Sequence, residues 1–517
     1  MWLAIQLPEG MLGVWNWEYP NGARVYTDGC FAPSDGSDPI PVIGFEHDLQ
    51  WQDENGNETS YDRFGENVRG LGGVVHFTLQ GGRKITVTAQ GKWAQRYSDI
   101  TNRTGAALGG GLNEMVVTTS DGTNSDEKNF DLDSPLAGLP ILIKDNIEAI
   151  GLPGTAGSTA LLDHPVSTDS ELVRRLRAGG ANIIASTNLS EWANIRSSSS
   201  TSGWSGVGGL TANPWMHKHS AGGSSSGSGA AIAAGLVTLA VGTETDGSII
   251  CPASLNGCVG IKPTVGLVPT QGIVPISANQ DAPGPMARSV KDAAILLEIM
   301  SATTGLVKAC DDSRALKIGV VRSWLTGHGA TDSLFDSVLS QLSKAGMTLV
   351  EVSLKAPGED VGADEYEVLL HELFDEMGSY LSVRADTSLR SLAQLVAYNS
   401  AHKEVELKYF AQELFDKAIK LGGRNNAYKV KRARNLAWAQ RTLAKGFTDV
   451  DVLIGATYSP AWISTLGEGD AYGDNSWITM APAIAGTPIG TVPMGIVEGL
   501  PVGLGVVAKA DDRLEKR

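Results

Sequence analysis

Residues 220–235 read SAGGSSSGSGAAIAAG, and residues 242–252 read GTETDGSIICP. The first stretch is rich in glycine and serine, yet it leads directly into a small-residue apolar segment that is typical of a buried helix followed by a strand. A flexible linker is not expected directly beside buried elements, so a linker is the least favoured interpretation. The two stretches therefore predict an α/β core in which one serine-rich loop precedes a helix and a second serine-bearing loop follows soon after.

Two known motifs match the first stretch in part. A phosphate-binding loop requires GxxxxGK[ST], but Ser228 occupies the position of the lysine that would contact the phosphates. A nucleophile elbow requires GxSxG, which residues 223–227 match with Ser225 at the centre. That motif also needs a strand directly before the serine and a histidine base later in the chain. The last hundred residues contain no histidine and His371 lies in a helical pattern, so the elbow has no base.

A lysine offers the base that a histidine does not. Lys144 ends the apolar run ILIK, residues 141–144. Burial of a lysine favours the neutral amine and lowers its pKa, and a neutral amine can accept the proton of a serine hydroxyl. Because most lysines at strand ends are exposed surface residues, this prediction rests on the neighbouring motifs as well as on Lys144.

The chain divides into a β-rich region and an α/β region. Residues 1–105 contain strand-like runs, two of them on either side of Gly81 and Gly82, and residues 106–133 have the composition of a linker. Strand-like and helix-like segments alternate over residues 134–517, which predicts a central sheet covered by helices. The expected elements include strands at 138–144 and 182–187, helices that begin at the capping pair Thr168 and Glu171 and at Ser289, and a mostly helical region from about 330 to 450.

The composition is that of an acidic globular protein. The 517 residues are 42% hydrophobic and carry a net charge of −16, which leaves no basic surplus for nucleic acid or for an anionic membrane. The four cysteines show no zinc-type spacing, and we find neither a signal peptide nor an apolar run of membrane-spanning length. We therefore expect a cytoplasmic protein that acts on a small molecule or a peptide, with no nucleic acid partner and no membrane span.

Five separated blocks of the sequence resemble the amidase signature family, in the family's order. They are LPILIKDNI, STNLSEWAN, GGSSSGSGAA, GTETDGSIICPASLNGCVGIKPTVG and GPMARSVKDAA, and the similarity spans about residues 134–510. Within the family, SGWSGVGGLTANP together with TETDGS resembles the peptide amidases and related members. The resemblance implies an α/β/α fold with a central mixed sheet, hydrolysis of amides, and no metal or other cofactor.

The catalytic group of that family is a lysine with two serines. By position the group falls on Lys144, Ser224 and Ser248. The resemblance implies that Ser248 attacks the amide carbonyl, that Ser224 passes on its proton and that Lys144 accepts it. It also implies a cis peptide bond between Gly223 and Ser224.

The resemblance further implies where the substrate binds. The oxyanion hole falls on the backbone N–H groups of Thr245, Asp246, Gly247 and Ser248. Asp246 stands where many members have glycine, so its carboxylate is expected either to point away from the oxyanion or to bind a donor of the substrate. Ser198 is implied to line the acyl site through its backbone.

The N-terminal region departs from the family, whose members carry helices ahead of the lysine strand. Here GFEHDLQW, residues 44–51, and the following hairpin resemble part of a lipocalin-like domain, and the family's last helix is absent after residue 510. These departures predict a fused chain or an amidase domain shortened at both ends. The leading hypothesis is an amidohydrolase. The alternatives are a glutaminase-type subunit of a tRNA-dependent amidotransferase, and a catalytically impaired fusion whose β-region binds an apolar ligand.

Overall fold

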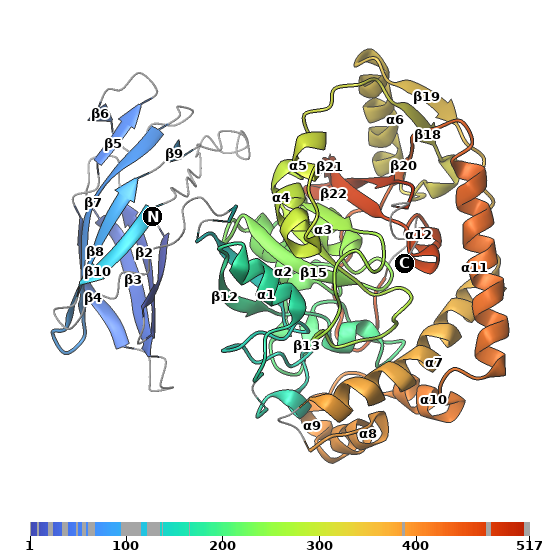
Figure 1. Cartoon of the computed structure of the whole chain (residues 1–517), viewed down its shortest axis with the longest axis horizontal. Helices are drawn as coiled ribbons and strands as arrows, with labels where there is room; N and C mark the ends of the chain where they lie inside the picture. The colour runs from blue at the N-terminus through green and yellow to red at the C-terminus, as the bar shows by residue number, and fades with distance from the viewer. Residues whose placement is uncertain are drawn as a thin grey trace. The chain divides into compact units, whose positions relative to one another are not determined.

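The chain forms two compact units, Met1–Leu139 and Pro140–Arg517, in a computed structural model (Figure 1). The structure describes residues 135–510 apart from 137, 165, 385–387 and 472–476, and before them the strands of the N-terminal unit with the turn at 80–83. Most of the stretch expected to be a linker lies outside these residues. Its described part is a strand, β10 (Met115–Ser120), which pairs with β8 of the N-terminal unit.

In its described residues the N-terminal unit is a ten-stranded sheet with strand order β1-β2-β3-β4-β7-β5-β6, in which β8 and β9 also pair with β7. The predicted hairpin joins β7 to β8, and Gly81 and Gly82 at its turn have φ of 96° and 88°, which glycine adopts readily. The strands are β1 (Trp2–Leu7), β2 (Gly10–Glu18), β3 (Arg24–Pro33), β4 (Ile40–His47), β5 (Gln50–Asp53), β6 (Glu58–Thr59), β7 (Val68–Leu79), β8 (Lys84–Gly91) and β9 (Trp93–Ala94).

The C-terminal unit is built on a mixed sheet. Its described strands run in the order β12-β11-β15-β17-β16-β21-β22-β20-β18-β19. Strands β12, β11 and β15 are parallel to one another, as are β20, β18 and β19, and the pairs between these two groups are antiparallel. The strands are β11 (Pro140–Lys144), β12 (Asn182–Thr187), β15 (Leu239–Glu244), β16 (Val259–Lys262), β17 (Ala282–Ala287), β18 (Lys317–Val320), β19 (Thr348–Glu351), β20 (Val452–Ala456), β21 (Ile489–Val497) and β22 (Leu500–Val507), with a separate pair, β13 (Trp204–Ser205) and β14 (Gly209–Leu210).

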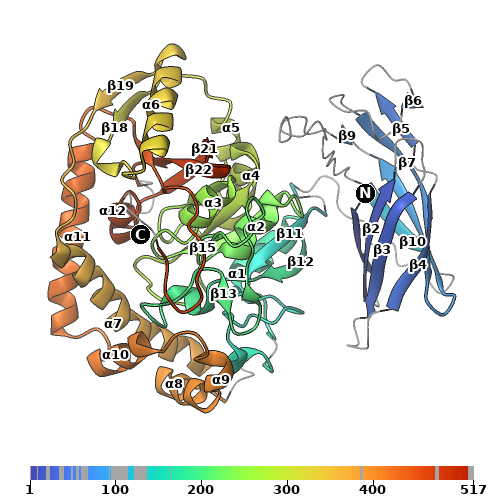
Figure 2. The ribbon, with the colours of Figure 1, turned by 180° about the vertical axis from the view of Figure 1, so that it is seen from behind.

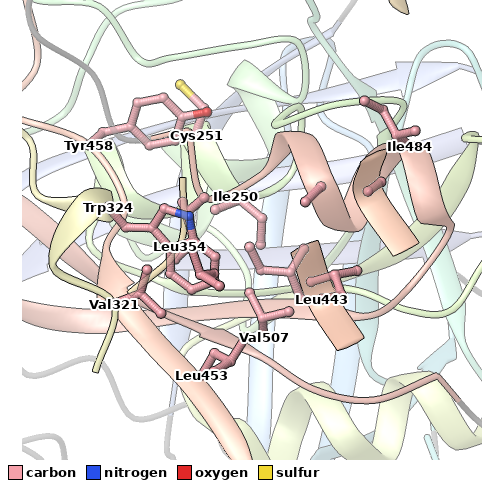
Figure 3. Close-up of a cluster of buried hydrophobic side chains, with 14 of the residues drawn as sticks. Ile250, Cys251, Val321, Trp324, Leu354, Leu443, Leu453, Tyr458, Ile484 and Val507 are labelled. Carbon is pink, nitrogen blue, oxygen red and sulfur yellow. The ribbon is translucent and has the colours of Figure 1, made fainter. Parts of the chain in front are cut away.

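Helices cover both faces of this sheet. Leu453 and Ile454 are neighbours on β20 and therefore point to opposite faces. Leu453 packs in the cluster of Figure 3 with Leu443 of α11, whereas Ile454 packs with Phe335 of α6. The helices are α1 (Glu171–Ala178), α2 (Ser226–Ala233), α3 (Ile250–Asn256), α4 (Val290–Ser301), α5 (Leu306–Ala309), α6 (Gly329–Lys344), α7 (Glu359–Val383), α8 (Leu392–Ala401), α9 (Lys403–Glu406), α10 (Glu413–Leu421), α11 (Asn426–Gly446) and α12 (Met480–Ala485).

The expected α/β fold with a central mixed sheet is confirmed, and the predicted helical region is α6 to α11, of which α7 to α11 curve around one side of the unit (Figures 1 and 2). None of the described helices combines the length and the apolar character that a membrane crossing requires.

The two predicted helix starts have different outcomes. Ser289 caps α4 as predicted. Helix α1 begins at Glu171 and is capped by Ser170, so the prediction that Thr168 is the cap is wrong. The Ser170 backbone N–H donates to the Glu148 carbonyl at 2.9 Å, which holds this residue outside the helix. Its hydroxyl is then the group that reaches the free N–H groups of the first turn.

Candidate active site

Lys144 is fully buried at the carboxyl end of β11. Its Nζ donates to Ser224 Oγ at 2.7 Å and to two oxygens of Thr243, Oγ1 at 2.9 Å and the carbonyl at 3.1 Å. Burial lowers the pKa of Lys144 to about 7, against the opposing attraction of Glu244 and Asp281. Near neutral pH, therefore, a large fraction of Lys144 is the neutral amine, which at this distance can accept a proton from the Ser224 hydroxyl.

Ser224 is held in place through the glycine that precedes it. The Gly223–Ser224 peptide bond is cis, as the resemblance implied. A Cβ atom at Gly223 would lie 2.2 Å from Ser190 Oγ and 2.6 Å from Ser202 Oγ, so no larger residue fits there. The Ser190 N–H also donates to the Ser224 carbonyl at 3.1 Å. Gly223 is therefore required by close packing and is not a sign of a flexible linker.

Ser225 joins the two serine-bearing loops. Its N–H donates to the Ser248 carbonyl at 3.1 Å. Its hydroxyl donates to the Thr243 carbonyl at 3.0 Å and accepts from the Thr243 N–H at 3.1 Å. Ser225 Oγ is therefore fully occupied in a buried position, which argues against the nucleophile-elbow interpretation.

Ser248 lies half-buried between β15 and α3. Its hydroxyl forms no hydrogen bond with another described residue, whereas the hydroxyls of Ser224 and Ser225 are both engaged. Gly247 before it has φ of 77°, and a Cβ there would lie 2.7 Å from Tyr458 Oη.

The start of α3 is fixed directly behind Ser248. The Glu244 carboxylate accepts from the N–H groups of Ile249 at 2.6 Å and Ile250 at 2.9 Å. Ile250 then enters the hydrophobic cluster of Figure 3. The backbone that carries the serine is therefore held by a buried carboxylate on one side and by the core on the other.

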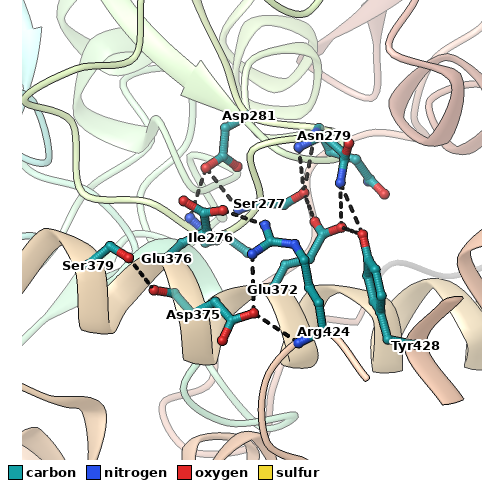
Figure 4. A network of polar contacts seen from close by, with 11 residues as sticks. Ile276, Ser277, Asn279, Asp281, Glu372, Asp375, Glu376, Ser379, Arg424 and Tyr428 are labelled. Carbon is teal, nitrogen blue, oxygen red and sulfur yellow. Dashed lines mark hydrogen bonds and ion pairs between the residues drawn. The ribbon is translucent and has the colours of Figure 1, made fainter. Parts of the chain in front are cut away.

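Thr245 is anchored by an aspartate far along the chain. Its Oγ1 donates to Asp281 Oδ1 at 2.7 Å, and Asp281 Oδ2 accepts from the N–H groups of Ile276 and Ser277 at 2.8 and 2.9 Å. Burial raises the pKa of Asp281 to about 6. Ser277 donates in turn to Glu372 of α7 (Figure 4). A continuous set of polar contacts therefore connects the loop before Ser248 to α7.

Asp246 points into the protein. Its carboxyl lies beside Thr479 and Glu365 of α7, and burial raises its pKa to about 6. Of the two arrangements expected for this side chain, these contacts favour the one in which it is turned away from the oxyanion.

Ser198 and His371 have other partners. The N–H and the hydroxyl of Ser198 donate to Glu413 Oε1 of α10 at 2.6 and 2.9 Å, so its N–H is engaged within the protein. His371 lies in α7, in keeping with its helical pattern, and is buried there with Nδ1 2.8 Å from the Gly422 carbonyl oxygen. In the part of the chain that the structure describes, no group of three or more His, Cys, Asp or Glu side chains is arranged to hold a metal ion.

The sequence did not single out Thr243, Asp281 or Glu365. Thr243 could have been found, because it lies shortly before Ser248 in the same block. Asp281 lies just before the block that contains GPMA, so its closeness to a recognisable block was a weak indication of a role in the site. Glu365 carried none, because it belongs to a helical segment more than a hundred residues beyond Ser248.

The chain is similar to known proteins of one family. The family model named Amidase matches residues 111–513. The chain belongs to the amidase family. It is 36% identical over 387 residues to a probable amidase of Arabidopsis thaliana, covering 70% of this chain and 73% of that protein. It is 34% identical over 406 residues to a glutamyl-tRNA(Gln) amidotransferase subunit of Geobacillus thermodenitrificans, covering 73% and 81%.

Among solved structures, the native peptide amidase of Stenotrophomonas maltophilia is 40% identical with a TM-score of 0.67, covering 72% of this chain and 79% of that one. A peptide amidase in complex with the competitive inhibitor chymostatin is 41% identical, also with a TM-score of 0.67, covering 72% and 80%. This amidase is therefore a hydrolase that acts on amides, on the α/β fold that these enzymes share.

Proposed function

We propose that Ser248 is the nucleophile, that Ser224 relays the proton and that Lys144 is the general base. The observation that carries this proposal is the buried Lys144 amine, 2.7 Å from Ser224 Oγ and with its pKa lowered to about 7. A base whose pKa lies near the working pH is both available as the free amine and able to return the proton. Among the described residues, no histidine forms a hydrogen bond with the side chain of Ser224, Ser225 or Ser248.

The proposed reaction proceeds through an acyl-enzyme. Ser248 Oγ forms a bond to the amide carbonyl carbon while its proton passes through Ser224 to Lys144. The backbone N–H groups from Thr245 to Ser248 stabilise the oxyanion, and one such donor contributes about 2.7–4 kcal/mol. The C–N bond then breaks as Lys144 returns the proton to the leaving nitrogen, which departs as ammonia or an amine. Water attacks the ester by the same route and releases the carboxylate.

The proposed substrate is a peptide amide or a related carboxamide. The solved peptide amidases are 40–41% identical to this chain. By comparison, the solved glutamyl-tRNA(Gln) amidotransferase subunit of Thermotoga maritima is 26% identical. The contrast in identity favours a free-standing amidase over the glutaminase-type alternative, which requires a second protein. Binding of an apolar ligand by the N-terminal unit stays a prediction, because most side chains of that unit lie outside the described residues.

Labelling with a fluorophosphonate that reacts with activated serines tests the assignment. We expect one adduct, on Ser248, because this residue is only half-buried, whereas Ser225 is buried and its Oγ is hydrogen-bonded. The matched variants are Ser248→Ala and Ser225→Ala, read by peptide mass spectrometry after digestion. Labelling that persists in Ser248→Ala, or an adduct on Ser225, would show that the nucleophile is wrongly assigned.

A further inference from the structure

Two carboxyl groups, one half-buried and one buried, meet at the loop that carries Ser248. Asp246 comes from that loop and Glu365 from the first half of α7, and the two carboxyl groups lie within hydrogen-bonding reach of each other. Glu365 is 5% exposed, and Asp246 Oδ1 has no solvent contact and no N–H or hydroxyl donor of its own. Two carboxyl groups can be hydrogen-bonded only when one of them carries a proton.

The same contact holds the backbone of the loop. Gln280, which is fully buried, donates through Nε2 to Glu365 Oε1 at 3.0 Å and to the Thr245 carbonyl at 3.4 Å. Glu365 therefore reaches the loop twice, directly at Asp246 and through Gln280 at Thr245. These are two of the residues whose N–H groups we assign to the oxyanion hole.

The surroundings keep the proton on the pair. Burial and the charge of Asp246 raise the pKa of Glu365 well above its usual range. Three further charged groups face the pair: Glu244 of β15, Lys262 of β16 and Arg432 of α11. Both cations donate to carbonyl oxygens, Lys262 to Pro263 at 3.1 Å and Arg432 to Ile484 at 3.0 Å. Neither cation is hydrogen-bonded to Asp246 or Glu365 among the described residues, so each acts on the two carboxyl groups only through its charge.

We propose that Asp246 and Glu365 share one proton, and that this carboxyl pair is a positioning element that fixes the oxyanion loop against α7. Its consequence for catalysis rests on the proposed function. Loss of the proton at alkaline pH leaves two adjacent anions, which repel each other and displace the loop. The pair therefore sets an upper pH limit on kcat that is separate from the ionisation of Lys144.

The stability of Glu365→Gln tests whether the proton is shared, and this measurement does not depend on activity. Glutamine keeps an N–H donor for Asp246 but takes up no proton. The wild-type folded state holds a proton that the unfolded chain releases above about pH 4.3. As pH rises above this value, the equilibrium constant for unfolding of the wild type should therefore increase tenfold per pH unit relative to that of Glu365→Gln. This increase should stop at the pKa of the pair.

The matched control is Glu372→Gln, two turns further along α7. Glu372 is equally buried, but it accepts from the hydroxyls of Ser277 and Tyr428 and contacts no second carboxyl group among the described residues. This variant controls for the loss of a buried carboxyl group of α7 that has no carboxyl partner. If wild type and Glu365→Gln show parallel pH dependence in chemical denaturation, no proton is shared and the proposal is overturned.

The pH dependence of kcat tests the positioning role. We expect kcat of the wild type and of Glu372→Gln to fall at alkaline pH, and the fall to be absent in Glu365→Gln, with KM changing less than kcat. If kcat of Glu365→Gln still falls at alkaline pH, the positioning role is overturned. The fall then belongs to another ionising group, such as Lys262, whose pKa burial lowers to about 8.

A third measurement separates this proposal from the proposed function. Absence of all amide hydrolysis in the wild type would contradict the function and not the pair. Hydrogen exchange in residues 244–248 would then decide the positioning role. Faster exchange in Glu365→Leu than in the wild type supports it, and equal exchange overturns it.

Discussion

Replacing Lys144 with methionine is expected to lower kcat by a factor on the order of 10⁴ or more, the cost of removing one member of a catalytic group that acts as a unit. Methionine fills a similar volume but cannot accept the proton that Ser224 passes on. The stability of the folded protein should not fall with kcat. Burial lowers the pKa of Lys144 to about 7, so at any pH where the lysine is charged in the unfolded chain, burying it costs free energy. The measurements are kcat and the melting temperature at neutral pH, and we expect the melting temperature to be equal or higher.

The control for this variant is Lys262→Met. Lys262 is the other lysine that is fully buried among the described residues, and its Nζ donates to a backbone carbonyl and not to a serine. Its loss leaves Glu244 without the cation that faces it, so the free energy of unfolding should fall. We expect at least about a hundredfold smaller loss in kcat than for Lys144→Met. Equal losses in the two variants would mean that Lys144 acts by its charge or its packing and not as the base.

Replacing Ser248 with alanine is expected to lower kcat by a factor on the order of 10⁵, with little change in KM, because the variant retains the pocket and loses the attacking oxygen. Stability should change little, since the Ser248 hydroxyl forms no hydrogen bond with another described residue. Steady-state kinetics on a peptide amide, with released ammonia as the readout, measures the loss.

Ser225→Ala is the matched comparison. Its hydroxyl bonds to both backbone groups of Thr243, so alanine should cost about 1–3 kcal/mol of stability by leaving a buried donor without a partner. Its kcat should fall far less than that of Ser248→Ala. The reverse order of the two losses would restore the elbow interpretation, with Ser225 as the nucleophile.

Local features of the fold could be predicted where short-range chemistry decides them. The segment NIIAST became β12, Asn182–Thr187, because its apolar and β-branched residues suit a strand beside the lysine strand. The cap of α1 was placed two residues too early, because a backbone contact with Glu148 decides between Thr168 and Ser170. That contact comes from a distant segment and leaves no trace in the local pattern.

The same distinction holds for the site. Lys144, Ser224 and Ser248 each stand in a recognisable block, and the structure brings Lys144 to Ser224 and the two serine-bearing loops side by side. Asp281 and Glu365 contact the same loop from other parts of the chain. Burial raises the pKa of both, an effect of the assembled fold that no sequence window contains.

The pH dependence of kcat/KM tests the central claim, that a neutral lysine is the base, most directly. The fraction of Lys144 in the neutral form grows as pH rises through its pKa of about 7, so kcat/KM should rise tenfold per unit below that value. It should then level off, before the alkaline fall that we assign to the Asp246 and Glu365 pair. Ser225→Ala should show the same inflection. A kcat/KM that does not change across this range, or that rises only near the ordinary lysine value of 10.5, would contradict the assignment of Lys144 as the base.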